Sequence, residues 1–228
     1  MTGRIQYQLL AALFEYPDAH YPSRVRDIED YLRGSYADAA VELGRFIDLL
    51  PGDDLQAMQE LFTRSFDVQA ATTLDVGYVL FGDDYKRGIL LANLNREHRA
   101  AGIDTGTELG DYIPNLLRLM AAIDDEEVLH DLAYAILGPA LLEMIGEFST
   151  DRIQKRNISY EKHYKTLIEA PAVAADAVTL YQFALKCLYT VLKQDFALIE
   201  KMPLQRSNEF LASVSRENEI EQAAAASS

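Results

Sequence analysis

Apolar residues recur along most of this chain at intervals of three and four positions, the spacing that gathers side chains on one face of an α-helix. Alternation with a period of two, which would indicate strands, is scarce. The pattern predicts helices close to residues 5–13, 25–32, 41–50, 55–66, 85–101, 116–120, 124–148, 160–169 and 175–201. We therefore expect an all-α, single-domain helical bundle of about eight to ten helices.

Capping residues, glycine and proline between the apolar stretches define where several of the predicted helices begin and end. Asp53 or Asp54 is expected to cap the helix that follows Pro51-Gly52, and Asp124 begins a capping box with Glu127. Gly138-Pro139 should kink or split the long helix that contains it. From about Gln205 the chain turns polar, so we assign the helical domain to residues 1–204 and expect a mobile, disordered tail at residues 205–228.

The composition agrees with a folded protein that is not inserted in a membrane. Apolar residues make up 49% of the 228 positions, which is enough for a sizeable core. No apolar run approaches the ~20 residues needed to cross a bilayer. The first apolar run, Leu9–Phe14, is short for a signal peptide and ends at the charged Glu15. We expect a cytoplasmic protein without stable membrane insertion.

The net charge of −15 narrows the choice of partners. Long-range repulsion disfavours nucleic acid and anionic membranes, and it favours a basic partner. The same charge could also serve only to keep the protein soluble, and charge alone does not separate these readings. The single cysteine, Cys187, excludes an intramolecular disulfide and is expected to be a small buried hydrophobe.

Residues that could carry catalysis are scattered. The four histidines show no metal-binding spacing, and the chain contains no phosphate-binding glycine loop or nucleophile elbow. Paired carboxylates such as Asp83-Asp84 are better explained as helix starts than as acid–base pairs. We therefore expect no enzymatic activity, no cofactor and no metal.

Two local patterns are more informative. The first is Phe81–Gly88, with the sequence FGDDYKRG, and the second is Glu108–Pro114, with the sequence ELGDYIP. The first can be a turn followed by a capped helix start. In the second, Asp111 could cap the next helix, or it could form with Glu108 an acidic surface for a segment of arginines followed by apolar residues. The pattern alone leaves both possibilities open.

With these patterns, the chain resembles the TorD/DmsD/NarJ family of molybdoenzyme assembly chaperones, nearest the branch called the nitrate reductase delta subunit. The resemblance runs from about Ile5 to Glu169 and includes Phe14–Pro17 (FEYP) and Leu61–Asp67 (LFTRSFD). The family's most specific motif is an acidic residue, Pro-Asp, an aromatic residue or histidine, an apolar residue and proline. The chain matches this motif except that Gly110 stands where proline is usual, which is expected to loosen the turn.

The resemblance implies a cytoplasmic, non-enzymatic, system-specific chaperone. Such proteins bind the N-terminal segment, often a twin-arginine signal, of the apo catalytic subunit of a DMSO reductase-family molybdoenzyme. They hold this molybdopterin-containing subunit for cofactor insertion and assembly before membrane targeting or export. The alternative is a structural subunit that is retained in a redox enzyme complex.

The resemblance and the two patterns together predict a peptide-binding site. Apolar walls are expected from three aromatic residues and two leucines, acidic contacts from Glu108 and Asp111, and Lys86 and Arg87 could pair with the client or sit in solvent. Each aromatic residue could instead belong to the core. The predicted site residues are Tyr78, Phe81, Asp84, Tyr85, Arg87, Glu108, Asp111, Tyr112, Pro114, Leu116 and Leu119.

Overall fold

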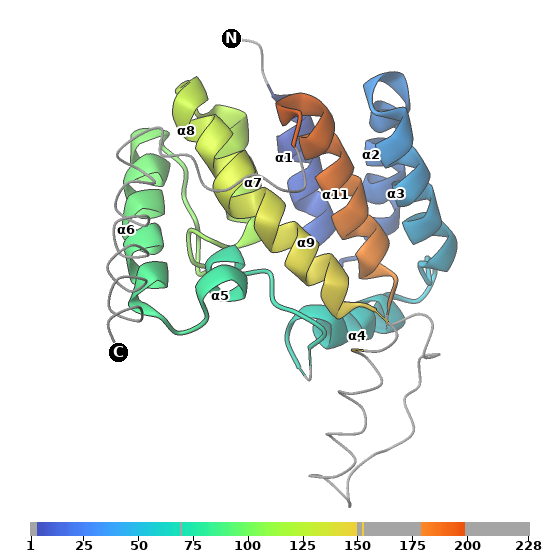
Figure 1. The fold of residues 1–228 in the computed structure, drawn as a ribbon. Helices are drawn as coiled ribbons and strands as arrows, with labels where there is room; N and C mark the ends of the chain where they lie inside the picture. The colour runs from blue at the N-terminus through green and yellow to red at the C-terminus, as the bar shows by residue number, and fades with distance from the viewer. Residues whose placement is uncertain (1–3, 69, 150–151, 153–178, 199–228) are drawn as a thin grey trace, which may run out of the picture. The chain divides into compact units, whose positions relative to one another are not determined.

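The structure is a computed structural model that describes residues 4–68, 70–149, 152 and 179–198 (Figure 1). These residues form helices and connecting loops, and none of them forms a β-strand. The prediction of an all-α fold is therefore confirmed. The helix expected at residues 160–169 and the tail expected at residues 205–228 lie outside the described residues.

Most helices lie near the ranges that the apolar pattern predicted, and the short helix at Val76–Phe81 was not predicted. The helical elements are α1 (Ile5–Ala11), the 3₁₀ turn η1 (Ala12–Phe14), α2 (Tyr21–Ser35), α3 (Ala37–Leu49), α4 (Leu55–Phe66), α5 (Val76–Phe81), α6 (Tyr85–Ala100), α7 (Ile113–Ala122), α8 (Glu126–Asp131), the π-helical turn η2 (Leu132–Leu137), α9 (Gly138–Glu147) and α11 (Tyr181–Phe196).

The chain forms two compact units, each assembled from segments that are distant in sequence. The first unit comprises residues 1–14, 75–140 and 192–228, and the second comprises residues 15–74 and 141–191. Helices α1, α5, α6, α7 and α8 belong to the first unit, and α2, α3 and α4 belong to the second. Both predicted motifs therefore fall in the first unit.

The core of the first unit is built on the contact between α1 and α7. Tyr7 and Leu10 of α1 and Leu116 and Leu119 of α7 are completely buried. Burying one leucine side chain in this way stabilises the fold by about 1.5–3 kcal/mol. The apolar stripe that predicted the first helix included Ile5, which is 48% exposed, and the buried face of α1 is instead formed by Tyr7, Leu10 and Ala11.

The core of the second unit is an aromatic cluster around Tyr181. The ring centroid of Tyr181 lies 4.9 Å from that of Phe66, 5.2 Å from that of Phe46 and 5.7 Å from that of Phe62. Two of these pairs meet edge to face, which adds about 0.5–1.5 kcal/mol per pair beyond the burial of the rings. The cluster joins α3, α4 and the start of α11.

Acidic residues cap α4 and α8 at or near the expected positions. Asp54 caps α4, with its carboxylate accepting the N–H of the residue three positions ahead at 2.9 Å. Asp125, rather than the predicted Asp124, caps α8 and accepts two backbone N–H groups. The difference of one residue arises because several acidic side chains follow one another and each could fill the cap position.

The helical stretch Glu126–Glu147 lies within the helix predicted at residues 124–148 and is strongly apolar. It contains an 18-residue window of mean hydropathy 1.4, so its length and composition alone would permit it to cross a membrane. However, 56% of that window is buried inside the protein, including Leu132, Ile136 and Leu137. Core helices have the same composition, so this feature is weak evidence for a membrane span.

Gly138-Pro139 changes the winding of this stretch without interrupting it. Proline has no N–H and its ring crowds the carbonyl four residues earlier, so a regular α-helix does not accommodate it. Here the preceding turn η2 is π-helical, and the N–H of Gly138 donates to the carbonyl of Ala133, five residues back. The helical run is therefore not split, because one wider turn accommodates the proline.

A glycine is needed where this turn closes. A Cβ atom at Gly138 would lie 2.9 Å from the backbone oxygen of Ala133. We expect Gly138→Ala to lower the free energy of unfolding by about 1–3 kcal/mol, because backbone must shift to relieve the contact. Urea unfolding followed by circular dichroism measures this change. Gly146→Ala in α9 is the control, because open space surrounds Gly146; equal losses for both variants would contradict the explanation.

Candidate functional site

The two sequence patterns meet in the first unit, where α5, α6 and the start of α7 come together. A tight turn at Gly82, with φ of +61°, joins α5 to α6. The N–H of Val76 donates to the carbonyl of Asp111 at 3.0 Å, and Asp75 and Tyr112 form an isolated antiparallel bridge. The backbone therefore holds the start of α5 against the segment that leads into α7.

Arg87, in the first turn of α6, binds two carboxylates across this junction. Its Nε donates to Oδ2 of Asp111 at 3.0 Å, and its Nη2 donates to Oδ2 of Asp75 at 2.9 Å. A longer contact of 3.5 Å joins Nη2 to Oδ1 of Asp111. The guanidinium carbon lies 5.5 Å from the ring centroid of Tyr78, within range of a cation–π interaction. We call Asp75, Arg87 and Asp111 the ionic junction.

Burial and the neighbouring charges shift the pKa values of Asp75 and Arg87 in the ionic junction. The Asp111 side chain has no exposed surface, whereas those of Asp75 and Arg87 are partly exposed. Burial, followed by the nearby charge of Asp111, raises the pKa of Asp75, and Arg87 opposes this shift. Burial lowers the pKa of Arg87, but its bonds to Asp111 and Asp75 outweigh that effect and raise the pKa, so the guanidinium stays charged. Two carboxylates thus share one cation.

Gly77 makes room for the ionic junction. A Cβ atom at this buried position would lie 2.6 Å from Oδ2 of Asp111 and 3.2 Å from Cγ of Arg87. Real Cβ atoms do not approach other atoms as closely as 2.6 Å, so any larger residue would displace the carboxylate. The absence of a side chain at Gly77 is therefore part of the site.

Asn115 holds the loop between α6 and α7, His98 joins α6 to α7, and sequence reasoning missed both. The buried amide of Asn115 donates to the carbonyls of Thr105 and Leu109, each at 3.1 Å. The ring nitrogens of His98 lie 2.8 Å from the carbonyl of Leu94 and 3.3 Å from that of Asn115. These contacts hold the loop in place although Gly110 replaces the proline that was expected to stiffen it.

The structure corrects the role predicted for Asp111. The residue at the N-cap position of α7 is Tyr112, so Asp111 does not cap that helix. Its carboxylate is fully buried and bound to Arg87, so it does not present a surface to a partner's arginines. Arg87 likewise does not sit in solvent or point toward a client. Its inward direction follows from its spacing, because Arg87 precedes the buried Leu90 and Leu94 by three and seven positions.

Other predicted wall residues belong to the core of the first unit. Leu116 and Leu119 are completely buried in α7, and Pro114 is buried in its first turn, so none of them lines an open groove. Tyr112 is half-buried, and its hydroxyl donates to the carbonyl of Phe14 at 3.1 Å. These four residues support the site rather than forming its surface.

The remaining predicted residues stay accessible. Tyr78 is 44% exposed and Tyr85 is 51% exposed, and Leu109, which was not predicted, is 48% exposed. Glu108 is exposed and Phe81 is half-buried. We call Tyr78, Phe81, Tyr85, Glu108 and Leu109 the aromatic–acidic surface. Asp84 has a structural role instead, because its carboxylate caps α6 by accepting the N–H of Lys86 at 2.9 Å.

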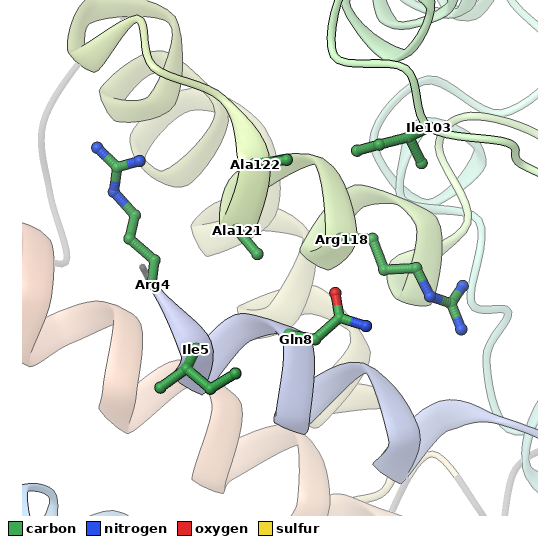
Figure 2. A pocket seen from close by; sticks show the side chains of 7 residues that line it. All are labelled: Arg4, Ile5, Gln8, Ile103, Arg118, Ala121 and Ala122. Carbon is green, nitrogen blue, oxygen red and sulfur yellow. The ribbon is translucent and has the colours of Figure 1, made fainter. Parts of the chain in front are cut away.

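A second accessible feature of the first unit is an open hollow of about 360 Å³ between α1, α7 and the loop that follows α6. Figure 2 shows Arg4 and Arg118 flanking it from opposite sides. Its lining is mostly apolar and consists of Arg4, Ile5, Gln8, Ile103, Arg118, Ala121 and Ala122.

Two kinds of reactive group, clustered metal ligands and a cysteine thiol, could support catalysis in the described residues. Among residues 4–68, 70–149, 152 and 179–198, no three histidine, cysteine or acidic side chains are grouped so that they could hold a metal ion. Cys187 is buried in the second unit, and burial raises the pKa of its thiol. A protonated, inaccessible thiol is a poor nucleophile.

Comparison with known proteins gives one informative similarity. No protein-family model matches the chain. The chain is similar to a protein of Bacillus subtilis (strain 168) named as a probable nitrate reductase molybdenum cofactor assembly chaperone NarJ. The two sequences are 26% identical over 125 residues, which make up 54% of this chain and 68% of the relative. This distant similarity supports the resemblance to the NarJ branch, and the relative's name is that of a chaperone rather than of a catalyst.

Removing the buried carboxylate of the ionic junction tests its structural role. We expect Asp111→Ala to lower the free energy of unfolding by about 3 kcal/mol, because loss of one partner of a buried ion pair typically costs about 3–5 kcal/mol and Asp75 retains part of the contact. Urea unfolding measures the change. Asp83→Ala removes an exposed carboxylate and should stay within about 0.5 kcal/mol of the unmodified protein. A matching small effect for Asp111→Ala would mean that the ion pair contributes little.

Adding a methyl group at Gly77 tests the packing of the same junction. We expect Gly77→Ala to destabilise the protein by about 1–3 kcal/mol, because the new Cβ displaces Asp111 from Arg87. Gly88→Ala is the matched control, since Gly88 lies in α6 with open space around it and alanine favours a helix by about 0.5–1 kcal/mol. Thermal unfolding should move the two melting temperatures in opposite directions, and a shift in the same direction would reject the model.

Proposed function

We propose that this protein is a cytoplasmic, NarJ-like assembly chaperone for a molybdenum-containing oxidoreductase. It binds the N-terminal segment of the apo catalytic subunit, holds that subunit until its cofactor is inserted, and then dissociates. The observation that carries the proposal is the similarity over 125 residues to a protein named as a nitrate reductase molybdenum cofactor assembly chaperone. Nitrate reductase is accordingly the client that we propose.

The aromatic–acidic surface supports this function physically. Tyr78, Tyr85 and Leu109 each expose close to half of their side chain, and such amphipathic groups are common anchors at protein interfaces. Glu108 adds an exposed carboxylate, and the carboxylate of Asp75 is partly exposed. A segment with basic residues next to apolar ones would match this surface.

Arg87 and Asp111 of the ionic junction keep this surface in shape without taking part in binding directly. Because Asp111 is bound to Arg87, the protein's own cation neutralises the most buried carboxylate. Tyr78 lies on α5 and Tyr85 opens α6, and the junction ties both helices to the segment before α7. Binding of a client therefore needs no rearrangement of a buried charge.

Calorimetric titration with the N-terminal peptide of the catalytic subunit of nitrate reductase, the client that we propose, tests the function. We expect saturable binding that weakens as salt rises, because acidic and basic groups meet at an exposed surface. Tyr78→Ala and Tyr85→Ala should each weaken binding about ten-fold, equivalent to about 1.4 kcal/mol. Tyr31→Ala, which removes a comparably exposed tyrosine from the second unit, should leave the affinity unchanged.

Co-purification from cells that make the client distinguishes the chaperone from a retained structural subunit. A chaperone should co-purify with the apo catalytic subunit and be absent from the mature enzyme. Failure to bind the peptide, together with stable association at fixed stoichiometry with the mature enzyme, would reject the chaperone and favour a structural subunit. Equal losses of affinity for Tyr31→Ala and Tyr78→Ala would place the binding site elsewhere.

A further inference from the structure

Two members of the aromatic–acidic surface, Glu108 and Leu109, belong to the loop of residues 101–112, which joins α6 to α7. The loop contains three glycines, and two of them, Gly102 and Gly106, have positive φ values of +68° and +63°. Glycine loses more backbone entropy on ordering than any other residue, so such a loop stays ordered only if contacts offset that cost. The positions of Glu108 and Leu109 therefore depend on what holds the loop.

One side chain of α7, that of Asn115, ties this loop to the helix. Its Nδ2 donates to the carbonyl of Thr105 and to that of Leu109, each at 3.1 Å. The carbonyl of Leu109 also accepts the backbone N–H of Tyr112 at 3.2 Å. The two bonds from Asn115 enclose the segment that contains Glu108. They hold the backbone of Leu109 inward, while Leu109 as a whole remains 48% exposed.

The surroundings of Asn115 fix the orientation of its amide. Nη1 of Arg118 donates to Oδ1 of Asn115 at 3.1 Å, so the NH₂ group faces the two loop carbonyls. Asn115 is only 2% exposed, so a polar group left unpaired here would pay the full cost of desolvation. An amide supplies the two donors and the acceptor, whereas a carboxylate of nearly the same shape has no N–H to donate. The position therefore requires an amide rather than an acid.

Helix α6 supports the loop from its other side. A Cβ atom at Gly110 would lie 3.3 Å from Oδ1 of Asn95 and 3.4 Å from Cβ of Leu94, so the loop backbone lies close against α6 at this point. His98 of α6 in turn places Nε2 3.3 Å from the carbonyl of Asn115. The loop is thus held between α6 and α7 by contacts that do not involve the guanidinium of Arg87.

We infer that Asn115 is a positioning residue for client binding, which holds Glu108 and Leu109 where they meet the client and does not touch the client itself. This inference rests on the proposed function and divides the aromatic–acidic surface into two parts. The ionic junction positions the tyrosines of α5 and α6, and Asn115 positions the loop. A loop that is ordered before binding loses less entropy on association, so the bonds from Asn115 raise the affinity for the client.

Calorimetric titration of full-length variants with the N-terminal peptide of the catalytic subunit of nitrate reductase tests the inference. Asn115→Asp should weaken binding about five-fold per folded molecule, because carboxylate oxygens then face two carbonyl oxygens and neither can donate. Asn115→Ala, which removes the donors without adding a charge, should weaken binding to a similar extent. Gln56→Glu makes the same change from amide to acid at an exposed position of α4 and should leave the affinity unchanged. Circular dichroism gives the folded fraction of each variant.

A double-mutant cycle separates positioning from a general loss of structure. Leu109→Ala should weaken binding in the unmodified protein but have little further effect in the Asn115→Ala protein, because both changes remove the same contact with the client. Tyr78→Ala should weaken binding about ten-fold in both proteins, because the ionic junction positions Tyr78. Without any client, hydrogen exchange followed by mass spectrometry should show faster exchange of residues 102–110 in Asn115→Ala.

The possible outcomes distinguish this inference from the proposed function. Additive losses for Leu109→Ala and Asn115→Ala, or an unchanged affinity of Asn115→Asp, would overturn the inference and leave the proposed function intact. Faster hydrogen exchange throughout the chain, rather than in the loop, would also overturn it, because Asn115 would then stabilise the fold as a whole. Failure of the unmodified protein to bind the peptide would reject the proposed function and the inference together.

Discussion

The contact between Arg87 and Asp111 joins two segments that lie 24 residues apart, and the geometry of the candidate site depends on it. A carboxylate without exposed surface is stable only with a paired charge or several hydrogen bonds, so Asp111 requires a partner at this place. That requirement explains why Gly77 has no side chain and why the backbone of Val76 is bonded to Asp111. Helices α5, α6 and α7 are positioned together by one guanidinium.

This arrangement separates support from recognition within a single motif. An acidic turn beside an aromatic residue has the composition of a binding surface, yet here its aspartate is internal and Tyr112 is tied to Phe14. The accessible groups are instead Tyr78, Tyr85, Glu108 and Leu109. Any partner of this face meets aromatic rings whose positions were set before binding, which reduces the entropy lost on association.

The sequence predicted the helices well because apolar spacing reports directly on the buried face of a helix. It predicted the cap at Asp54 for a similar reason, since only local backbone geometry is involved. The pairing of Arg87 with Asp111 is different, because a chain with many acidic and basic residues permits many pairings and tertiary packing chooses among them. One signal was present, since Arg87 shares a helical row with Leu90 and Leu94, and that row is buried. Nothing in the sequence indicated the roles of Gly77 and Asn115.

The cations of the first unit that the structure describes at these two places, the ionic junction and the hollow, are used within the protein itself. At the ionic junction Arg87 binds two carboxylates. At the hollow Arg4 pairs with Glu126, and Arg118 donates to Oδ1 of Asn115. These guanidinium groups therefore position the protein's own helices and loops. In a protein of net charge −15, long-range attraction then favours a partner that brings its own basic residues.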